Sequence, residues 1–120
     1  MAEEKDIELK QLEGFTGTEK YYVVLGANVT DGIHYIMDNG YAWLVTDMLS
    51  VIKFGIDEYP KLKGQHFLAI KLKVTGKEAK ATIDDGNENV LYTQEYKWTD
   101  AKKDLVLYFI DNVLMLSSEY

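Results

Sequence analysis

The period of the hydrophobic pattern changes once along this chain, near residue 65, and this change restricts the fold more than any other feature. Between Tyr41 and about Lys53, apolar residues recur at the spacing of one helix face, which predicts an amphipathic helix. From His66 onward, apolar and polar residues alternate with a period of two, which indicates strands. The expected buried stripe of the helix is Tyr41, Leu44, Val45, Met48, Leu49 and Ile52. We therefore expect helices first and a sheet after them.

A shorter helix is expected before the amphipathic one, over the stretch DGIHYIMD at 31–38, after a first strand at 21–27. Thr30 can cap its N-terminus through the hydroxyl, and Asp31 lies in the first turn, where the helix dipole favours a carboxylate. Gly40 supplies the left-handed backbone conformation that ends many helices. The sequence therefore predicts two helices separated by a tight turn at Gly40.

The second half contains strand-like segments separated by turn residues, at 66–74, 78–84, 90–98, 104–110 and 113–120. The segment DLVLYFI at 104–110 is apolar on both faces, which predicts a central strand that is covered on both sides. The expected fold class is α+β, with two short N-terminal helices packed on a four- to five-stranded, mainly antiparallel sheet.

The length of 120 residues fits one domain, so we expect residues 1–120 to form a single α+β unit. Residues 1–14 include five acidic side chains and few apolar ones, which is typical of a flexible or frayed arm. The chain has no cysteine, which excludes disulfides and thiolate metal sites.

Charge and hydropathy restrict the partners. No apolar segment of signal-peptide or membrane-span length occurs, which favours a cytoplasmic protein with no membrane partner. The net charge of −7 disfavours direct binding of nucleic acid, because contacts to phosphates need cations.

The stretch DDGNEN at 84–89 places three carboxylates and two asparagines between two strand-like segments. Asp85, Asn87 and Asn89 alternate as the oxygen ligands of a calcium loop do. However, Gly86 stands second rather than sixth, and no bidentate glutamate follows at the twelfth position. Asp-Gly between two alternating segments is a strong signal for a hairpin turn, since the turn needs positive φ. We interpret the stretch as a turn and predict no metal site.

The residues that commonly perform catalysis form no recognisable motif. His34 and His66 have no second histidine at metal-ligand spacing. Ser50, Ser117 and Ser118 lack the G-x-S-x-G pattern of a nucleophile elbow, and no complete phosphate-binding glycine loop occurs. We predict no catalytic residue and no cofactor, and we favour a non-enzymatic protein. The alternative is an enzyme or small-ligand-binding protein whose pocket, between helices and sheet, brings a histidine to a carboxylate.

Two aromatic residues stand where a surface contact is expected. Trp43 lies on the polar face of the amphipathic helix, so it is either covered by the short helix or the N-terminal arm, or available to a partner. Tyr35 lies on the side of its helix opposite the apolar residues. Together with the carboxylates of the turn, the interface candidates are Trp43, Tyr35, Asp84, Asp85 and Glu88.

Three segments resemble a known family in their residues and their order: TDGIHYIMDNGYAWLVTDML, IDDGNENVLYTQEY and LYFIDNVLMLSSEY. It is a family of small, uncharacterised proteins of bacteria, phages and other mobile elements, classed as a domain of unknown function. The likeness spans residues 15–120, and Ser117 stands where the family commonly has proline. The resemblance implies a cytosolic prokaryotic or phage protein, and no site residue follows from it.

This context and the acidic composition lead to one concrete expectation. We expect an interaction module of a phage or mobile element that inhibits a host defence complex stoichiometrically, as an anti-CRISPR protein does. The nucleic-acid channels of such complexes are basic, so carboxylates can dock where phosphates bind. The acidic residues in question lie in the arm and the turn, at Glu3, Glu4, Asp6, Glu8, Glu13, Asp84, Asp85 and Glu88. A further alternative is a homodimer formed through an exposed edge strand at 113–120.

Overall fold

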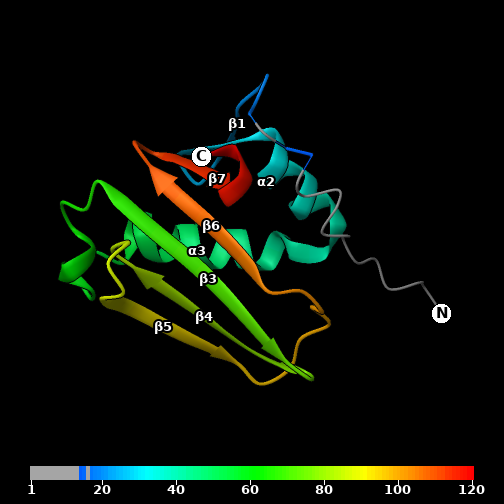
Figure 1. Cartoon of the computed structure of the whole chain (residues 1–120). Coiled ribbons are helices and arrows are strands. Elements are labelled where there is room, and N and C mark those ends of the chain that lie inside the picture. Colours follow the sequence, from blue (N-terminus) through cyan, green and yellow to red (C-terminus); the bar gives the residue numbers. More distant parts are fainter. Residues whose placement is uncertain (1–13, 16) are drawn as a thin grey trace.

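The computed structural model describes residues 14–15 and 17–120, which form a seven-stranded mixed sheet with one long helix across one face (Figure 1). The strands follow the order β1-β2-β7-β6-β3-β4-β5 across the sheet. The helical elements are α2 (Asp31–Ile36), the π-helical turn η1 (Met37–Tyr41), α3 (Ala42–Phe54), and the 3-10 turns η2 (Pro60–Leu62) and η3 (Ser117–Glu119). The strands are β1 (Tyr22–Val24), β2 (Ala27–Val29), β3 (Phe67–Thr75), β4 (Glu78–Asp84), β5 (Val90–Tyr96), β6 (Leu105–Ile110) and β7 (Val113–Leu116). Apart from its last residue, the predicted N-terminal arm lies outside the described residues.

The long helix α3 confirms the periodic pattern of the first half. Every member of the predicted stripe is buried, and the most exposed of them, Ile52, has an exposed fraction of 7%. Thr30 caps α2 as predicted, because its hydroxyl oxygen accepts a hydrogen bond of 3.3 Å from the backbone N–H of Ile33. Gly40 has φ +100°, and the chain bends there, inside η1 and shortly before α3 begins. The local signals therefore predicted α3 and the start of α2 correctly.

The first predicted strand is a hairpin of two short strands. Leu25 and Gly26 form its turn with φ of +52° and +82°, and Tyr22 pairs with Val29 across it. The second strand of this hairpin, β2, then runs parallel to β7. A leucine with positive φ is rare, so the residue types give little sign of a turn here. The prediction of a single strand was wrong.

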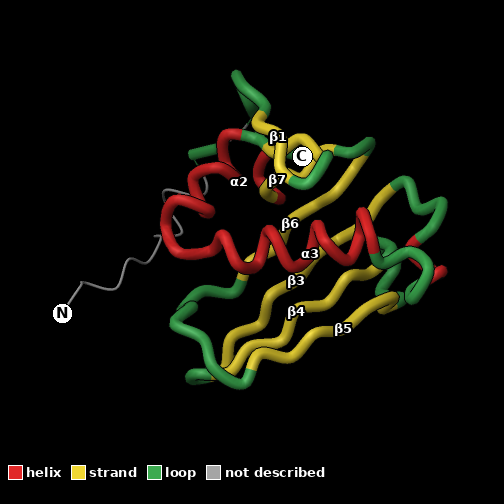
Figure 2. Tube along the Cα trace, turned by 180° about the vertical axis from the view of Figure 1, so that it is seen from behind, coloured by secondary structure: helices red, strands yellow, loops and turns green. Residues whose placement is uncertain are grey.

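The predicted arrangement of two helices on a four- to five-stranded, mainly antiparallel sheet is also wrong. The first helix, α2, is only six residues long and lies against β2 and β7, so α3 alone crosses the middle of the sheet (Figure 2). The sheet has seven strands because the N-terminal half adds a hairpin and the last segment joins it. It is mixed because β2 and β7 run in the same direction.

The strands of the second half follow the alternating pattern. In β3 and β4 the buried residues of the core face are those predicted from alternation: Leu68, Ile70, Leu72, Ala79, Ala81 and Ile83. β6 is the central strand, as predicted, but it is covered on one face only, since Val106 is 37% exposed. The segment expected at an edge, β7, lies between β2 and β6. The two sheet edges are β1 and β5.

The end of the chain closes onto the start of α2. The Glu119 carboxylate accepts hydrogen bonds from the Thr30 hydroxyl at 2.6 Å and from the backbone N–H of Gly32 at 3.2 Å. A β-carbon at Gly32 would collide with Glu119 and Leu116, so the close approach requires glycine. The N-terminus of α2 is therefore satisfied by the C-terminal residues of the chain.

No helix among the described residues is long and apolar enough to cross a membrane.

Candidate functional site

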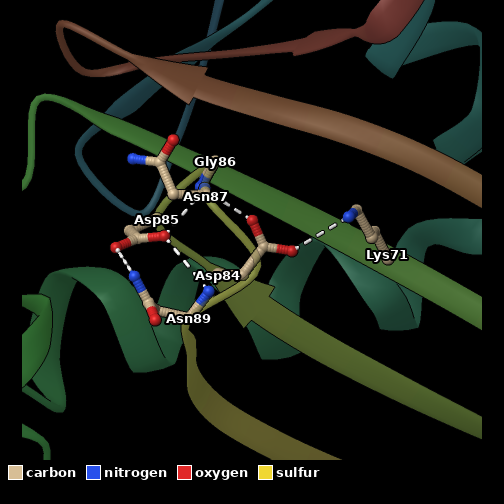
Figure 3. Close-up of polar contacts among 6 residues, drawn as sticks. All are labelled: Lys71, Asp84, Asp85, Gly86, Asn87 and Asn89. Carbon is tan, nitrogen blue, oxygen red and sulfur yellow. Dashed lines mark hydrogen bonds and ion pairs between the residues drawn. The ribbon is translucent and has the colours of Figure 1, made fainter.

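The acidic turn between β4 and β5 holds two of its three carboxylates, those of Asp84 and Asp85, in internal contacts (Figure 3). Asp84 is only 2% exposed. One of its oxygens accepts a hydrogen bond of 2.8 Å from the backbone N–H of Gly86, and the other lies 3.2 Å from the ammonium nitrogen of Lys71. Asp84 therefore organises the turn, and its carboxylate is not available to a partner.

The Asp85 carboxylate is likewise held by hydrogen bonds within the turn. Its Oδ1 accepts hydrogen bonds from the backbone N–H groups of Asn87 and Asn89, at 2.8 and 3.3 Å, and its Oδ2 accepts one of 2.9 Å from the Asn89 side chain. The Asn89 side chain, followed by these backbone donors, lowers the pKa of the Asp85 carboxyl. Glu88, with φ +66°, is exposed at the tip. The prediction of a turn is confirmed, and no group of three or more metal-ligating side chains occurs among residues 14–15 and 17–120.

The two histidines lie apart from each other and from the concave sites. His34 Nδ1 is 3.5 Å from Asp38 Oδ2, and the imidazole stacks on Tyr22 with ring centroids 4.1 Å apart. Both side chains of the His34–Asp38 pair are well exposed, with fractions of 43% and 67%. His66 is exposed just before β3. Neither imidazole lines the pocket beside Trp43 or the smaller hollow over β4 and β5 around Ala79 and Glu95.

The two aromatic candidates have different surroundings. Tyr35 is half-buried, with its ring 5.1 Å from that of Phe15. Trp43 is also half-buried, and its indole N–H donates a hydrogen bond of 2.8 Å to the carbonyl of Gly40. The ring of Tyr96 from β5 meets it edge to face at 4.8 Å. Trp43 therefore packs against the last residue of an edge strand, a contact that the sequence did not predict.

A pocket of about 480 Å³ opens beside Trp43, between the start of α3, the end of β5 and the segment that follows β5. It is lined by Gly40, Tyr41, Trp43, Asp47, Tyr96, Trp98, Thr99, Asp100 and Ala101. The segment after β5 is fixed to the β3–β4 turn, because the backbone N–H of Thr99 donates a 2.8 Å hydrogen bond to the carbonyl of Lys77. The Thr99 hydroxyl in turn accepts from the N–H of Ala101 at 3.1 Å. The wall of the pocket is thus held by hydrogen bonds rather than by side-chain packing alone.

Asp47 lies at the centre of the polar contacts in this pocket. The Tyr96 hydroxyl donates a hydrogen bond of 2.8 Å to Asp47 Oδ2. Among the described residues, none donates a hydrogen bond to the other oxygen, Oδ1. Burial of the phenol, together with this hydrogen bond to a carboxylate, raises the pKa of Tyr96. Tyr96 therefore stays protonated and orients Asp47, and it is unsuited to act as a base.

The lining of the pocket suits a cation. It combines carboxylates at Asp47 and Asp100 with the rings of Trp43, Tyr96 and Trp98, and it includes no lysine, arginine or histidine. Aromatic rings attract ammonium and guanidinium groups through their electron-rich faces. The Trp98 ring already makes such a contact within this chain, because the Lys77 ammonium lies 4.3 Å from the centroid of the ring. The pocket can therefore hold an ammonium or guanidinium group beside Asp47.

The sequence indicated part of this site. Trp43 and Asp47 are four residues apart on one helix, so their shared face follows from helical spacing. Tyr96, Trp98 and Asp100 were not singled out, because their approach to α3 depends on where that helix crosses the sheet. A tryptophan followed closely by an aspartate after a strand was the one signal available.

A family model described as "Family of unknown function (DUF6876)" matches residues 6–120 of the chain. The match confirms the resemblance to an uncharacterised family that three segments of the sequence had indicated. No curated protein and no solved structure matches the chain.

Proposed function

The chain belongs to this family of unknown function, and from its own residues we propose that it is a non-enzymatic protein-interaction module that binds a basic protein partner. A lysine or arginine side chain of that partner enters the pocket and meets Asp47 between the rings of Trp43, Tyr96 and Trp98. The observation that supports this most directly is the Asp47 carboxylate in the pocket lining, where one oxygen accepts the hydrogen bond from Tyr96 and the other accepts none from the described residues.

Charge and aromatic content both favour such a partner. The chain has a net charge of −7, which attracts basic surfaces and speeds association with them. Tryptophan and tyrosine are the residues most enriched among those that dominate binding energy at interfaces. Trp43 has this role in the proposal, with its ring held in place by the contact to Tyr96.

A narrower form of the proposal names the partner. In this form the chain is a phage or mobile-element protein, and it inhibits a host defence complex by covering a basic nucleic-acid channel. The acidic composition supports this version. Because the carboxylates of Asp84 and Asp85 are held inside the turn, the contact would rely on Asp47 and Asp100, with Glu88 as the exposed acid of the turn.

A second candidate is binding of a small organic cation. The pocket volume of about 480 Å³ lies within the range of small-molecule sites. An ammonium compound would use the same carboxylate and the same rings as a lysine side chain. The two candidates differ in what they need outside the pocket, since a protein partner buries surface around it.

The test is an affinity capture from a prokaryotic lysate with the full chain as bait and two matched pairs of variants. Asp47→Asn removes the pocket charge, and Asp57→Asn removes the charge of an exposed acid elsewhere. Trp43→Ala removes the pocket ring, and Phe54→Ala removes an aromatic ring that is 70% exposed on the same helix.

We expect a partner that is retained by the two control variants and lost from the two pocket variants, provided that circular dichroism shows all four to be folded. A partner that Asp47→Asn and Trp43→Ala still retain would contradict the proposal. Capture of a small amine alone, identified by mass spectrometry of the eluate, would favour the second candidate.

A further inference from the structure

The strand β5 forms a free edge of the sheet, on the side opposite β1 (Figure 2). Within the described part of the chain, β4 is the one strand that pairs with it. Natural proteins protect long edges with charged side chains, above all lysine, with proline or with a bulge inside the strand. β5 contains no lysine or proline, its one charged residue is Glu95, and its irregularity lies at its start, opposite Ile83 and Asp84. The regular stretch Tyr92–Tyr96 therefore leaves one side of its backbone unpaired.

The opposite edge of the sheet, β1, is too short to pair with much of an added strand. β1 has three residues, Tyr22–Val24, and it ends directly in the turn at Leu25 and Gly26. A strand of that length gives few backbone hydrogen bonds to an added chain. Of the two edges, β5 is therefore the one with room for a partner strand.

Side chains of β5 connect this edge with the pocket. Tyr92, Gln94 and Tyr96 pair directly with residues of β4 that are buried on the helix-covered face: Ile83, Ala81 and Ala79. Directly paired residues point to the same side of a sheet. The three β5 side chains therefore share the face on which α3 lies, and Tyr96 reaches Asp47 of α3 from there.

A strand added to this edge would place a side chain at the mouth of the pocket. Neighbouring strands lie about 4.8 Å apart. A residue directly opposite another has its β-carbon roughly 5 Å from that of its neighbour, on the same face. A long side chain opposite Tyr96 would thus start beside the tyrosine ring and extend toward Asp47 and Asp100. Lysine and arginine have the length and the charge that this position requires.

We propose that β5 binds an extended segment of the partner by strand addition, antiparallel to Tyr92–Tyr96, with a lysine or arginine of that segment opposite Tyr96. The inference rests on the proposed function, since the same pocket takes the cation. The occupant is specified by charge complementarity at Asp47 and Asp100 and by the continuity of the free edge with the pocket. Opposite Tyr92, four positions further along the segment, an apolar side chain is expected, because this tyrosine lies against Tyr59 with ring centroids 4.7 Å apart.

The probe is a blocked peptide of the same length as β5, acetyl-Thr-Lys-Thr-Thr-Thr-Val-Thr-amide, in which antiparallel pairing puts lysine opposite Tyr96 and valine opposite Tyr92. Two variants of the peptide are N-methylated at alternate residues. The first is methylated at the odd-numbered positions of the peptide, and the second is methylated at the even-numbered positions. In a strand, alternate residues direct their N–H groups to opposite edges, so one set faces β5 and the other faces solvent. Binding to the full chain, labelled with nitrogen-15, is followed by NMR.

We expect amide shifts along Tyr92–Tyr96 and slower solvent exchange of amides at this edge when the unmodified peptide is added. One methylated peptide should bind at least tenfold more weakly than the other. Equal binding of the two methylated peptides would overturn strand addition.

A lysine probe without a peptide strand distinguishes the two proposals. It is N-acetyl-lysine amide acetylated at the α-nitrogen, so its side-chain ammonium group is free. If it shifts the pocket resonances while the two methylated peptides bind equally, strand addition fails and the proposed function stands. If neither the amide nor any peptide shifts them, both proposals fail.

Discussion

Carboxylates lie beside both ends of β5, and they differ in how many of their oxygens are held by donors of the chain. At its start, the oxygens of Asp84 and Asp85 are held by Lys71 and by donors of their own turn (Figure 3). At its end, Asp47 lines a pocket, and its carboxylate accepts one hydrogen bond, from Tyr96, among the described residues. Of these two ends, the turn has the higher local density of acidic residues, but the Asp47 carboxylate lines a pocket. The donors around a carboxylate decide whether it can bind a partner.

The largest expected effect concerns the turn. Asp84→Ala removes a buried carboxylate, and it leaves the N–H of Gly86 and the ammonium of Lys71 without this partner. We expect a loss of about 2–3 kcal/mol in the free energy of unfolding, measured by urea denaturation. Binding of N-acetyl-lysine amide should not change. Asp57→Ala, at an exposed site, serves as the control and should stay within about 0.5 kcal/mol of the unsubstituted chain. An equal loss of unfolding free energy in Asp84→Ala and Asp57→Ala would contradict the claim that the Asp84 carboxylate holds the turn together.

The next effect concerns the pocket. Asp47→Asn keeps the shape of the side chain and removes its charge, so affinity for N-acetyl-lysine amide should fall about tenfold, which corresponds to about 1.4 kcal/mol. Isothermal titration of the two proteins measures this ratio. Asp100→Asn should have a smaller effect, since Asp100 is exposed at the rim of the pocket. Unchanged affinity in Asp47→Asn would show that this carboxylate is as unavailable as those of the turn.

A smaller effect is expected from Tyr96→Phe, which removes the hydroxyl that orients Asp47 and keeps the ring against Trp43. The free energy of unfolding should fall by about 1 kcal/mol, the typical net value of one hydrogen bond. Affinity for the lysine probe should stay within about twofold, because the carboxylate keeps its charge. If Tyr96→Phe weakens binding as strongly as Asp47→Asn, the hydroxyl itself contacts the ligand.

The smallest effect is the pH dependence that comes from Asp85. Hydrogen bonds in the folded protein lower the pKa of its carboxyl below the ordinary aspartate value of 3.8, so the unfolded chain binds the proton more readily. The resulting contribution to stability is complete above the unfolded pKa, and it disappears as the pH falls through the lower pKa of the folded state. Asp85→Asn should therefore reduce the loss of stability between pH 5 and pH 2, measured by thermal unfolding in steps of pH. An unchanged acid profile would indicate that the turn does not hold this carboxylate in solution.

The parts of the fold that the sequence predicted are those with local causes. The stripe of α3 follows from helical spacing, β3 and β4 follow from alternation, and β6 was expected from a short segment that is apolar on both faces. The hairpin of β1 and β2 was missed because its turn uses Leu25 with positive φ, a conformation that leucine rarely adopts. The parallel pairing of Asn28 with Val113 joins opposite ends of the chain, and no local pattern specifies such a contact.

In the candidate site, too, the sequence predicted what depends on local spacing and missed what depends on tertiary contacts. Trp43 was identified because a tryptophan on a polar helix face needs an explanation that helical spacing alone does not give. Its neighbour Tyr96 comes from an edge strand, so the contact depends on the angle at which α3 crosses the sheet. The carboxylates of Asp84 and Asp85 were identified from their density, but their hydrogen bonds depend on the exact path of the turn.

The most direct test of the account is an NMR titration of the full chain, labelled with nitrogen-15, with N-acetyl-lysine amide and, separately, with N-acetyl-norleucine amide. The second compound has a similar apolar chain and lacks the ammonium group. We expect saturable shifts of the Trp43 and Trp98 indole N–H resonances with the lysine compound only, and unchanged amide resonances at Gly86 and Asn87. Equal shifts with both compounds, or shifts that centre on the turn, would contradict the account.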